Sequence, residues 1–301
     1  MKKKNLLRML ILALVLVLAV AASGCGGETG NNPEDNPPDD PVINDPVDND
    51  PVIDNPVEDD SIHVSSTEEL FAAIAPGAKI VIEPGYYNMS EFVETFDHES
   101  MVTWNQENPY IRLEECFDGN DVFIRNVDGL SIAGGGENFS DTEIVVEPRY
   151  AAILSFENCK DIEISNITMG HTMQSDCSGN VLNFFGCDNV NLDKADLYGC
   201  GVIGINAKQN CGDITVTDSI IRDCSYGPIE IAECQGRYEF RNCVFKGSMG
   251  GGYYEKSGSS ELCFYDCEFG SEETNIWYFY EDIVAENCEW GEITQYPDYG
   301  W

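Results

Sequence analysis

The chain has 301 residues, of which 54 are acidic and 16 basic, giving a formal charge of −38 at pH 7. Its 43% of apolar residues are enough to bury a core, but the negative charge argues against nucleic acid as a partner. A polyanionic ligand would also be repelled unless a cation or a local basic patch intervened.

Residues 1–24 are typical of an export signal. Three lysines at positions 2–4 and Arg8 precede an apolar stretch from Met9 to Ala22, which is shorter than a typical transmembrane helix. The stretch ends in Ala-Ser-Gly-Cys, which resembles a bacterial lipobox, whose cysteine is acylated and becomes the first mature residue. We therefore expect a lipoprotein signal peptide, lipidation of Cys25, and a protein anchored to the membrane on the exported side of the bacterial cell envelope. An ordinary signal peptide with an incidental Cys25 is the alternative.

Residues 25–60 are expected to form an acidic, disordered tether rich in Pro, Asp and Asn. Four pentapeptides of the type Asp/Asn-Pro-Val-x-Asp/Asn begin at residues 40, 45, 50 and 55. Regular prolines prevent a helix and like charges repel, so at about 3 Å per residue the tether could reach on the order of 100 Å. Ca²⁺ is a conceivable cofactor, but these aspartates lack the preorganised geometry of a specific site, so no metal ligand is assigned.

Residues 61–301 are expected to form a single all-β domain that begins with a short helix. Ser66 and Glu69 fit a capping box, Leu70 and Ile74 would share one face, and Pro76 follows the segment. Such a helix would cover the open end of a stack of repeats. Residues 79–86 are interpreted as the first strand and turn, and residues 87–120 as an early coil with an excursion.

From about residue 130 the sequence repeats roughly every 24 residues. Six segments beginning at residues 162, 190, 214, 238, 262 and 283 align without gaps as apolar-x-apolar-x-Asn/Asp, then small-x-apolar. The period of two predicts strands, and a further short strand precedes each copy, leaving no room for a twelve-residue helix. Asn and Asp tolerate left-handed torsions, so the fifth position predicts a tight corner. That position holds Asn166, Lys194, Asp218, Asn242, Asp266 and Asn287.

This pattern resembles the right-handed parallel β-helix superfamily, the pectate-lyase-like fold, over about residues 64–289. The resemblance implies a solenoid of three short strands per coil, but the superfamily includes lyases, hydrolases, epimerases, adhesins and inactive binding modules. A pectate-lyase segment of the type Arg-x-x-Pro-x-x-Arg is missing from this sequence. Gly170-His171-Thr172 matches only two residues of the polygalacturonase Gly-His-Gly motif. No catalytic residue is therefore carried over from the superfamily.

Twelve cysteines follow Cys25, and most of them fall into columns on successive repeats. Neighbouring strands lie about 4.8 Å apart, within reach of a disulfide, and export would permit oxidation. We favour stacked thiols, with Cys177–Cys200 or Cys200–Cys224 as the best disulfide candidates. Zinc is not expected, because thiolates in a line are not tetrahedral. The columns are Cys159/Cys187/Cys211/Cys234, Cys177/Cys200/Cys224 and Cys243/Cys267/Cys288.

One outward column provides the candidate site. Tyr198, Arg222 and Lys246 occupy the same position of successive repeats, so that a ring is placed next to two cations that could hold an acidic sugar. His171 is the only histidine after His98 and would titrate near neutrality, and an insertion at residues 172–176 follows it. Alternatively, the two cations merely neutralise nearby aspartates. The candidate catalytic residues are His171, Arg222 and Lys246, and the candidate substrate-binding residues are Tyr198, Asp176, Asp196 and Asp223.

These features favour a monomeric, lipid-anchored surface protein whose β-helix recognises extracellular or envelope polysaccharide by binding. The enzymatic alternative is a lyase or glycoside hydrolase for acidic polysaccharide, in which Arg222 or Lys246 neutralises the uronate and His171 or Tyr198 moves the proton. A second alternative is a structural spacer that interacts only with proteins. The missing motifs favour binding over catalysis, and the column favours both over the spacer.

Overall fold

The computed structural model describes residues 60–173, 178–199, 202–247, 252–270, 278–279 and 283–290. The chain divides into two units, Met1–Pro56 and Val57–Trp301, and the described residues all belong to the second. The predicted signal peptide, Cys25 and the tether up to residue 59 lie outside the described residues, as do Asp176, Cys177 and Cys200. Within the described ranges, the helices are too short and too polar to cross a membrane.

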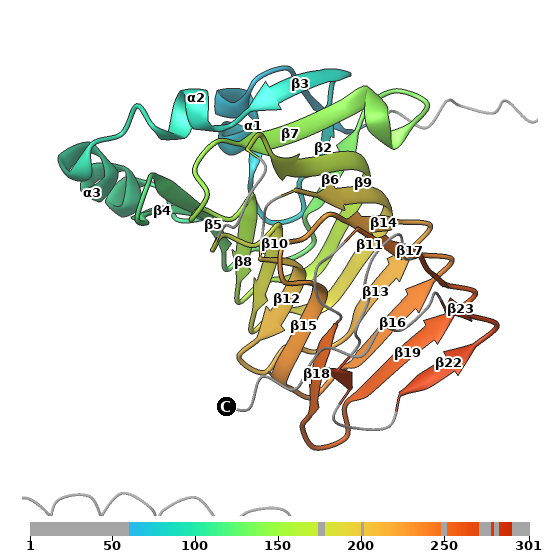
Figure 1. The fold of residues 1–301 in the computed structure, drawn as a ribbon. Coiled ribbons are helices and arrows are strands. Elements are labelled where there is room, and N and C mark those ends of the chain that lie inside the picture. The colour runs from blue at the N-terminus through green and yellow to red at the C-terminus, as the bar shows by residue number, and fades with distance from the viewer. Residues whose placement is uncertain are drawn as a thin grey trace, which may run out of the picture. The chain divides into compact units, whose positions relative to one another are not determined.

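Strands of successive repeats pair in parallel to form a β-helix, which confirms the predicted fold class (Figure 1). We describe it as three rows of strands. Row 1 contains β1 (Ile62–Val64), β2 (Lys79–Ile82), β6 (Ser131–Gly134), the first parts of β9 (Lys160–His171) and β11 (Asp188–Tyr198), β13 (Ile214–Thr217), β16 (Arg237–Arg241), β19 (Glu261–Tyr265) and β22 (Val284–Glu286).

The other two rows complete each coil. Row 2 contains β3 (Gly85–Asn88), β7 (Thr142–Val146), the last parts of β9 and β11, β14 (Ile220–Arg222), β17 (Val244–Lys246), β20 (Glu268–Phe269) and β23 (Glu289–Trp290). Row 3 contains β5 (Asn120–Arg125), β8 (Leu154–Glu157), β10 (Leu182–Phe185), β12 (Ile203–Lys208), β15 (Gly227–Cys234), β18 (Tyr253–Lys256) and β21 (Tyr278–Phe279).

The gap-free alignment of the repeats is confirmed by the strand register. In row 1, Val190 lies opposite Ile162 on one side and opposite Ile214 on the other, and all three are at most 1% exposed. Phenylalanines stack in the same way further along, with 5.3 Å between the ring centroids of Phe240 and Phe264. Each apolar face is therefore buried only by its neighbouring coils, as expected for a solenoid.

The predicted corners are confirmed at all six positions, where φ lies between 50° and 55°. Corner side chains also form hydrogen bonds to the preceding coil: Asn166 Nδ2 donates to Gly134 O at 2.9 Å, and Asn287 Nδ2 donates to Asp266 Oδ1 at 3.2 Å. Lys194 adopts the same left-handed torsion without a side-chain amide. These positions thus combine a backbone requirement with a ladder of polar side chains.

No two of the described cysteines are joined by a disulfide, and all but Cys116 and Cys288 are buried. In the first column, Cys187 follows Gly186, which has a φ of 61°, and its Sγ lies 3.4 Å from Phe156 O. This supports the preference for stacked thiols. The disulfides proposed from the sequence involve Cys177 or Cys200 and stay predictions, because both residues lie outside the described part of the chain.

The predicted capping helix is α1 (Thr67–Ala73), at the end of the stack where the coils begin (Figure 1). Ser66 Oγ accepts the N–H of Glu69 at 3.1 Å, as the capping-box pattern predicts. The Glu69 carboxylate instead accepts the backbone N–H of Ser65, one residue before the expected partner. Leu70 and Phe71 are buried in the core, so the helix does cover the first coil.

Residues 87–120 contain more structure than an early coil with an excursion. They form α2 (Ser90–Val93), α3 (His98–Glu107) and β4 (Ile111–Glu115), which pairs antiparallel with β5. Asp97 caps α3 by accepting the N–H of Ser100 at 2.9 Å, but only Met101 of this helix is buried. Its weak apolar face explains why the sequence pattern did not predict it. A short 3₁₀ turn, η1 (Phe139–Asp141), precedes β7.

Candidate functional site

The outward column predicted from the repeat exists in row 2 with the expected register. Tyr198 lies opposite Gly170 on one side and opposite Arg222 on the other, and Arg222 lies opposite Lys246. We call Gly170, Tyr198, Arg222 and Lys246 the row 2 column. Parallel pairing brings their Cα atoms to the spacing of neighbouring strands, about 4.8 Å.

Arg222 is held by two aspartates. Its Nε and Nη2 donate to the two carboxylate oxygens of Asp196 at 2.8 and 2.9 Å, and its Nη1 donates to Asp223 Oδ2 at 2.9 Å. Asp196 is only 7% exposed. Burial opposes the charge of Arg222, but the two carboxylates outweigh it and raise the pKa of this guanidinium. Arg222 therefore neutralises Asp196 and Asp223, as the simpler interpretation of the sequence expected.

Tyr198 is fixed on both faces of its ring. On one side, Gly170 lies so close that an added Cβ atom would be 2.5 Å from the ring. On the other side, the guanidinium carbon of Arg222 lies 4.6 Å from the ring centroid. The phenol donates a short hydrogen bond to the Glu143 carboxylate. Burial, together with this carboxylate, raises the pKa of Tyr198 well above its usual value. The ring is thus a structural part of the column, and its faces are not free to stack on a sugar.

His171 is not part of the outer column. It follows Gly170 in β9, so its side chain points to the opposite side of the strand, and the residue is only 3% exposed. Its Nε2 donates to Ala151 O at 2.9 Å, while Nδ1 is buried without a hydrogen-bond partner. Burial lowers the pKa of His171, which keeps the imidazole neutral at pH 7. The structure therefore separates His171 from the two cations with which the sequence grouped it.

Lys246 is exposed, and within the described part of the chain it forms no ion pair or side-chain hydrogen bond. Of the candidate residues, the structure thus brings Tyr198, Arg222, Asp196 and Asp223 into contact and leaves Lys246 in water beside them. Asp176 lies outside the described residues. Among the residues that the structure describes, no three His, Cys, Asp or Glu side chains are arranged to hold a metal ion.

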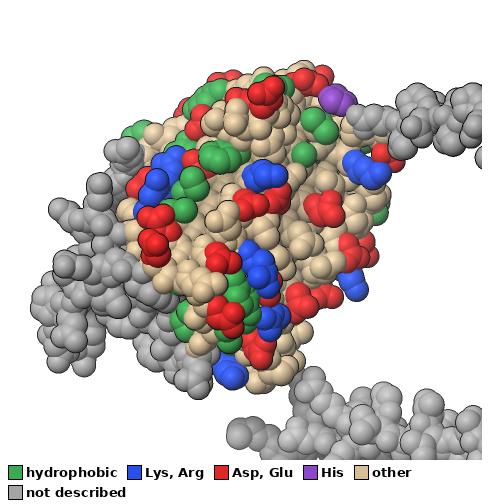
Figure 2. All heavy atoms as spheres, turned by 90° about the vertical axis from the view of Figure 1, so that its right-hand side faces the viewer, with side chains coloured by type: hydrophobic (Ala, Val, Ile, Leu, Met, Phe, Trp, Pro, Cys, Tyr) green, Lys and Arg blue, Asp and Glu red, His purple; other side chains and the backbone are tan. Residues whose placement is uncertain are grey.

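Charge is mixed across the outer surface of row 1. Figure 2 shows Lys and Arg side chains lying beside Asp and Glu side chains on this face of the molecule. Arg237 is typical, because it binds Glu239 at 3.0 Å and Glu261 at 2.6 Å. The basic side chains of this surface are therefore neutralised locally, and a polyanion would find little uncompensated positive charge.

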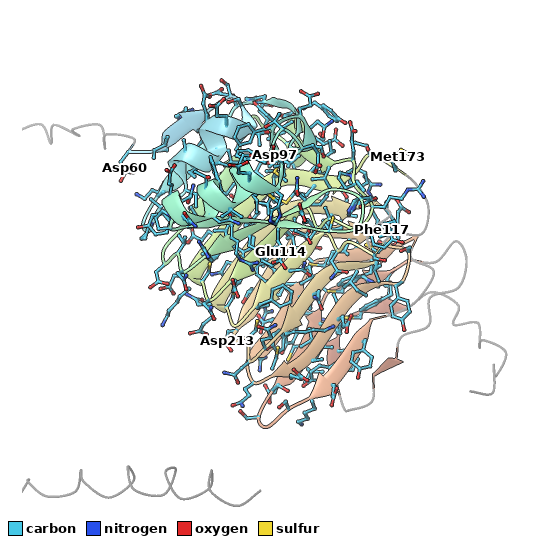
Figure 3. The ribbon with its side chains drawn as sticks, turned by 90° about the vertical axis from the view of Figure 1, so that its left-hand side faces the viewer. Asp60, Asp97, Glu114, Phe117, Met173 and Asp213 are labelled. Carbon is cyan, nitrogen blue, oxygen red and sulfur yellow. The ribbon has the colours of Figure 1, made fainter. Side chains whose placement is uncertain are left out.

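An open polar groove of about 420 Å³ lies at the corner between rows 3 and 1. It contains none of the candidate site residues. Asp213, labelled in Figure 3, lies at this corner. The lining consists mostly of turn residues, among them Gly186, Asp188, Asn210, Gly212, Asp213, Gln235 and Gly236.

Exposed aromatic residues at another corner were not predicted from the sequence. Phe117 is 84% exposed, Tyr226 is 62% exposed and Tyr150 is 42% exposed. All three lie in turns or loops next to row 3, outside the repeated strand pattern. For Phe117 a signal did exist, because an aromatic residue in the turn Cys116-Phe-Asp-Gly119 has no core position to fill.

Comparison with known proteins agrees with the fold. A family model described as right-handed beta helix region matches residues 114–269. No curated protein matches the chain. Among solved structures, ORF18 of Geobacillus virus E2 is 10% identical with a TM-score of 0.50, and the match covers 74% of this chain and 44% of that chain.

Two carbohydrate-related structures also match, at lower TM-scores. Pectin methylesterase PemA from Erwinia chrysanthemi is 12% identical with a TM-score of 0.40, covering 67% of this chain and 59% of that one. Pectate lyase pelN from Paenibacillus sp. 0602 is 9% identical with a TM-score of 0.39, covering 68% of this chain and 70% of that one. The chain thus spans less than two thirds of the viral protein and of PemA, and at 10% identity the likeness to the viral protein shows the fold alone.

Proposed function

This chain belongs to the right-handed β-helix family, and we propose that it is an exported, lipid-anchored protein that binds extracellular or envelope polysaccharide without cleaving it. The lipobox at Ala22-Ser-Gly-Cys25 and the acidic tether support the anchored location, with the membrane contacted through the lipid on Cys25. The binding role is supported by the row 2 column. We expect a monomer, since the coils bury their own apolar faces.

The observation that carries the proposal is the fixed network around Arg222. Three hydrogen bonds hold its guanidinium between Asp196 and Asp223, so these polar groups are in place before a ligand arrives. Preorganised groups lose little conformational entropy on binding. Sugar hydroxyls both donate and accept hydrogen bonds, and a surface that alternates cations with carboxylates suits them. Lys246 and the coil spacing of about 4.8 Å would extend this surface along a glycan chain.

The same geometry gives little support to the enzymatic alternative. General acid–base catalysis needs a group that titrates near the working pH and reaches the substrate. His171 is buried and neutral, and the pKa of Tyr198 is raised far from neutrality. Arg222 already binds two carboxylates, so a uronate would have to compete with both.

The test is a glycan screen on the full-length chain purified in detergent, with and without Ca²⁺. Neutral glucans and xylans, uronates and peptidoglycan would be compared, and both depletion of soluble protein and release of reducing or unsaturated ends would be measured. Lys246→Glu should weaken binding by about tenfold, which corresponds to about 1.4 kcal/mol. Lys208→Ala is the matched control, because Lys208 is paired with Glu230 in row 3 at 2.6 Å.

Three outcomes separate the candidate functions. Binding without new chain ends supports the proposal. New ends that form with wild-type protein would show that the chain is an enzyme. Absence of both signals on every glycan would leave the spacer role.

The anchor is tested separately by labelling cells with a radioactive or clickable fatty acid. Label should appear on the wild-type chain and disappear in Cys25→Ser, with the variant leaving the membrane fraction. An unlabelled wild-type chain would contradict the anchoring part of the proposal without affecting the binding part.

A further inference from the structure

Exposed apolar side chains gather where row 2 turns into row 3. Phe117 lies in the β4–β5 turn, and its ring centroid is 4.8 Å from that of Tyr150, in the segment before β8. Met173, just after β9, is 47% exposed, and its segment runs beside that of Tyr150, since Thr172 N donates to Val146 O. Figure 3 shows Phe117 and Met173 at the same edge of the molecule. We call Phe117, Tyr150 and Met173 the corner cluster.

The same corner carries Tyr226 further along the stack. Gly179 N donates to Arg149 O, Val202 N donates to Gly179 O, and Tyr226 N donates to Val202 O. Three such steps of about 4.8 Å place Tyr226 roughly 14 Å along the corner from the segment of Tyr150. Tyr226 also follows Arg222 by four residues, so this corner borders the row 2 column.

The corner cluster is held rigidly. Asp118, in the turn that carries Phe117, accepts the backbone N–H groups of Arg149 and Tyr150 at 2.8 and 3.0 Å. One coil segment and the hairpin turn are thereby clamped together by two charge-assisted hydrogen bonds. Gly119 packs so closely on Pro148 that an added Cβ would lie 2.4 Å from the proline ring. The backbone segments that carry the two aromatic rings are therefore fixed relative to each other, while the rings themselves extend into water.

The ring pair leaves apolar surface exposed to water. The two ring planes meet at 49°, and Phe117 is 84% and Tyr150 42% exposed. Exposed apolar surface of this kind, built on a fixed backbone, is typical of a binding site. Aromatic rings bind the apolar face of a partner, and the free lone pairs of Asp118 could accept hydroxyl groups beside them.

We propose that the corner cluster, extended by Tyr226, is a stacking platform for the rings of a neutral glycan. This inference rests on the proposed polysaccharide-binding function and names its substrate class. The local charge favours a neutral occupant. Asp118 and Asp121 accept backbone N–H groups of residues 149–152 beside the cluster, Glu147 belongs to the same loop, and Arg149 is the one basic residue of segments 116–121 and 147–152. The same carboxylates would repel a polyuronate and the anionic headgroups of a membrane.

The test uses the full-length chain carrying Cys25→Ser, so that no lipid anchor contributes to binding. A soluble β-glucan and a xylan are the neutral probes, polygalacturonate is the acidic probe, and phosphatidylcholine vesicles are the membrane probe. Phe117→Ala with Tyr150→Ala should weaken neutral-glycan binding by about tenfold or more, and Tyr226→Ala by a smaller factor. Val102→Ala is the matched control, since Val102 is an exposed apolar residue on α3. Thermal unfolding of each variant establishes that it is folded.

The outcomes distinguish this inference from the proposed function. Equal glycan affinity of the folded double variant and the wild type, with loss of affinity in Lys246→Glu, would overturn the platform and leave the row 2 proposal standing. Vesicle binding that disappears in the double variant would make the cluster a membrane contact instead, and preference for polygalacturonate would overturn the neutral-sugar assignment. A wild-type chain that binds none of the glycans would overturn both proposals.

Discussion

Replacing Arg222 with alanine should destabilise the chain by about 2–4 kcal/mol. Removal of the guanidinium leaves Asp196, which is 7% exposed, as a buried carboxylate without a cation. Breaking a buried ion pair in this way costs about 3–5 kcal/mol, and the lost contact with the Tyr198 ring adds about 0.5–1 kcal/mol. We reduce the total because 28% of the Arg222 side-chain surface is exposed to water, which weakens the pair.

Denaturant unfolding of four chains measures this effect: the wild type, Arg222→Ala, Asp196→Asn and the double variant. Asp196→Asn in the Arg222→Ala background should recover most of the lost stability, because the unpaired charge is gone. Lys160→Ala is the control, since its pair with Asp188 is half exposed at 3.6 Å and should contribute less than about 0.5 kcal/mol. A change below about 1 kcal/mol in Arg222→Ala, or no recovery in the double variant, would refute the view of Arg222 as a structural ion-pair partner.

Three further predictions concern the corners, one partly buried acid and the thiols. Lys194→Asn should raise the free energy of unfolding by about 0.5–1 kcal/mol, because asparagine tolerates the φ of 51° better and can join the corner ladder. Burial raises the pKa of Asp121 from 3.8 to about 6, so the folded chain binds this proton more tightly, and its stability falls as the pH rises from about 4 through 6. Asp121→Asn should therefore be more stable than the wild type above pH 6, by about 1–3 kcal/mol, in unfolding curves at pH 5 and pH 8. Iodoacetamide should modify half-buried Cys116 in the native chain, whereas Cys187 and Cys211 should react only after unfolding, as peptide mass spectrometry would show.

Each of these has a clear contrary result. Loss of stability in Lys194→Asn would mean that this corner is not strained by its lysine. A constant difference between Asp121→Asn and the wild type across pH would show that the carboxyl titrates normally in the folded chain. Rapid native-state labelling of Cys187 would contradict its burial, and a mass lower by two hydrogen atoms for a pair of these cysteines would reveal a disulfide.

The repeat was readable from the sequence because stacked coils impose one requirement over and over. Each copy needs inward apolar residues at period two and a residue that accepts a left-handed corner, and both show in the alignment of segments such as 214–221 and 238–245. The structure confirms that φ is positive at Asp218 and Asn242. Non-repeating parts carry no such redundancy, which is why α3 and the β4–β5 hairpin were not predicted.

The candidate site was predictable in register but not in geometry. Counting along the repeat correctly placed Arg222 opposite Tyr198 and Lys246. The sequence grouped His171 with this column, although the period of two that turns Met169 inward also turns His171 inward. Counting along the repeat could not show that Arg222 covers the Tyr198 ring, since ring contacts depend on side-chain rotamers.

The most direct test of non-catalytic recognition is a titration of the full-length chain with a neutral polysaccharide, in which bound protein and new chain ends are measured in the same samples. We expect saturable binding with no ends formed, and loss of that binding in Lys246→Glu but not in Lys208→Ala. Release of reducing or unsaturated ends in step with protein concentration would contradict this expectation and make this β-helix an enzyme.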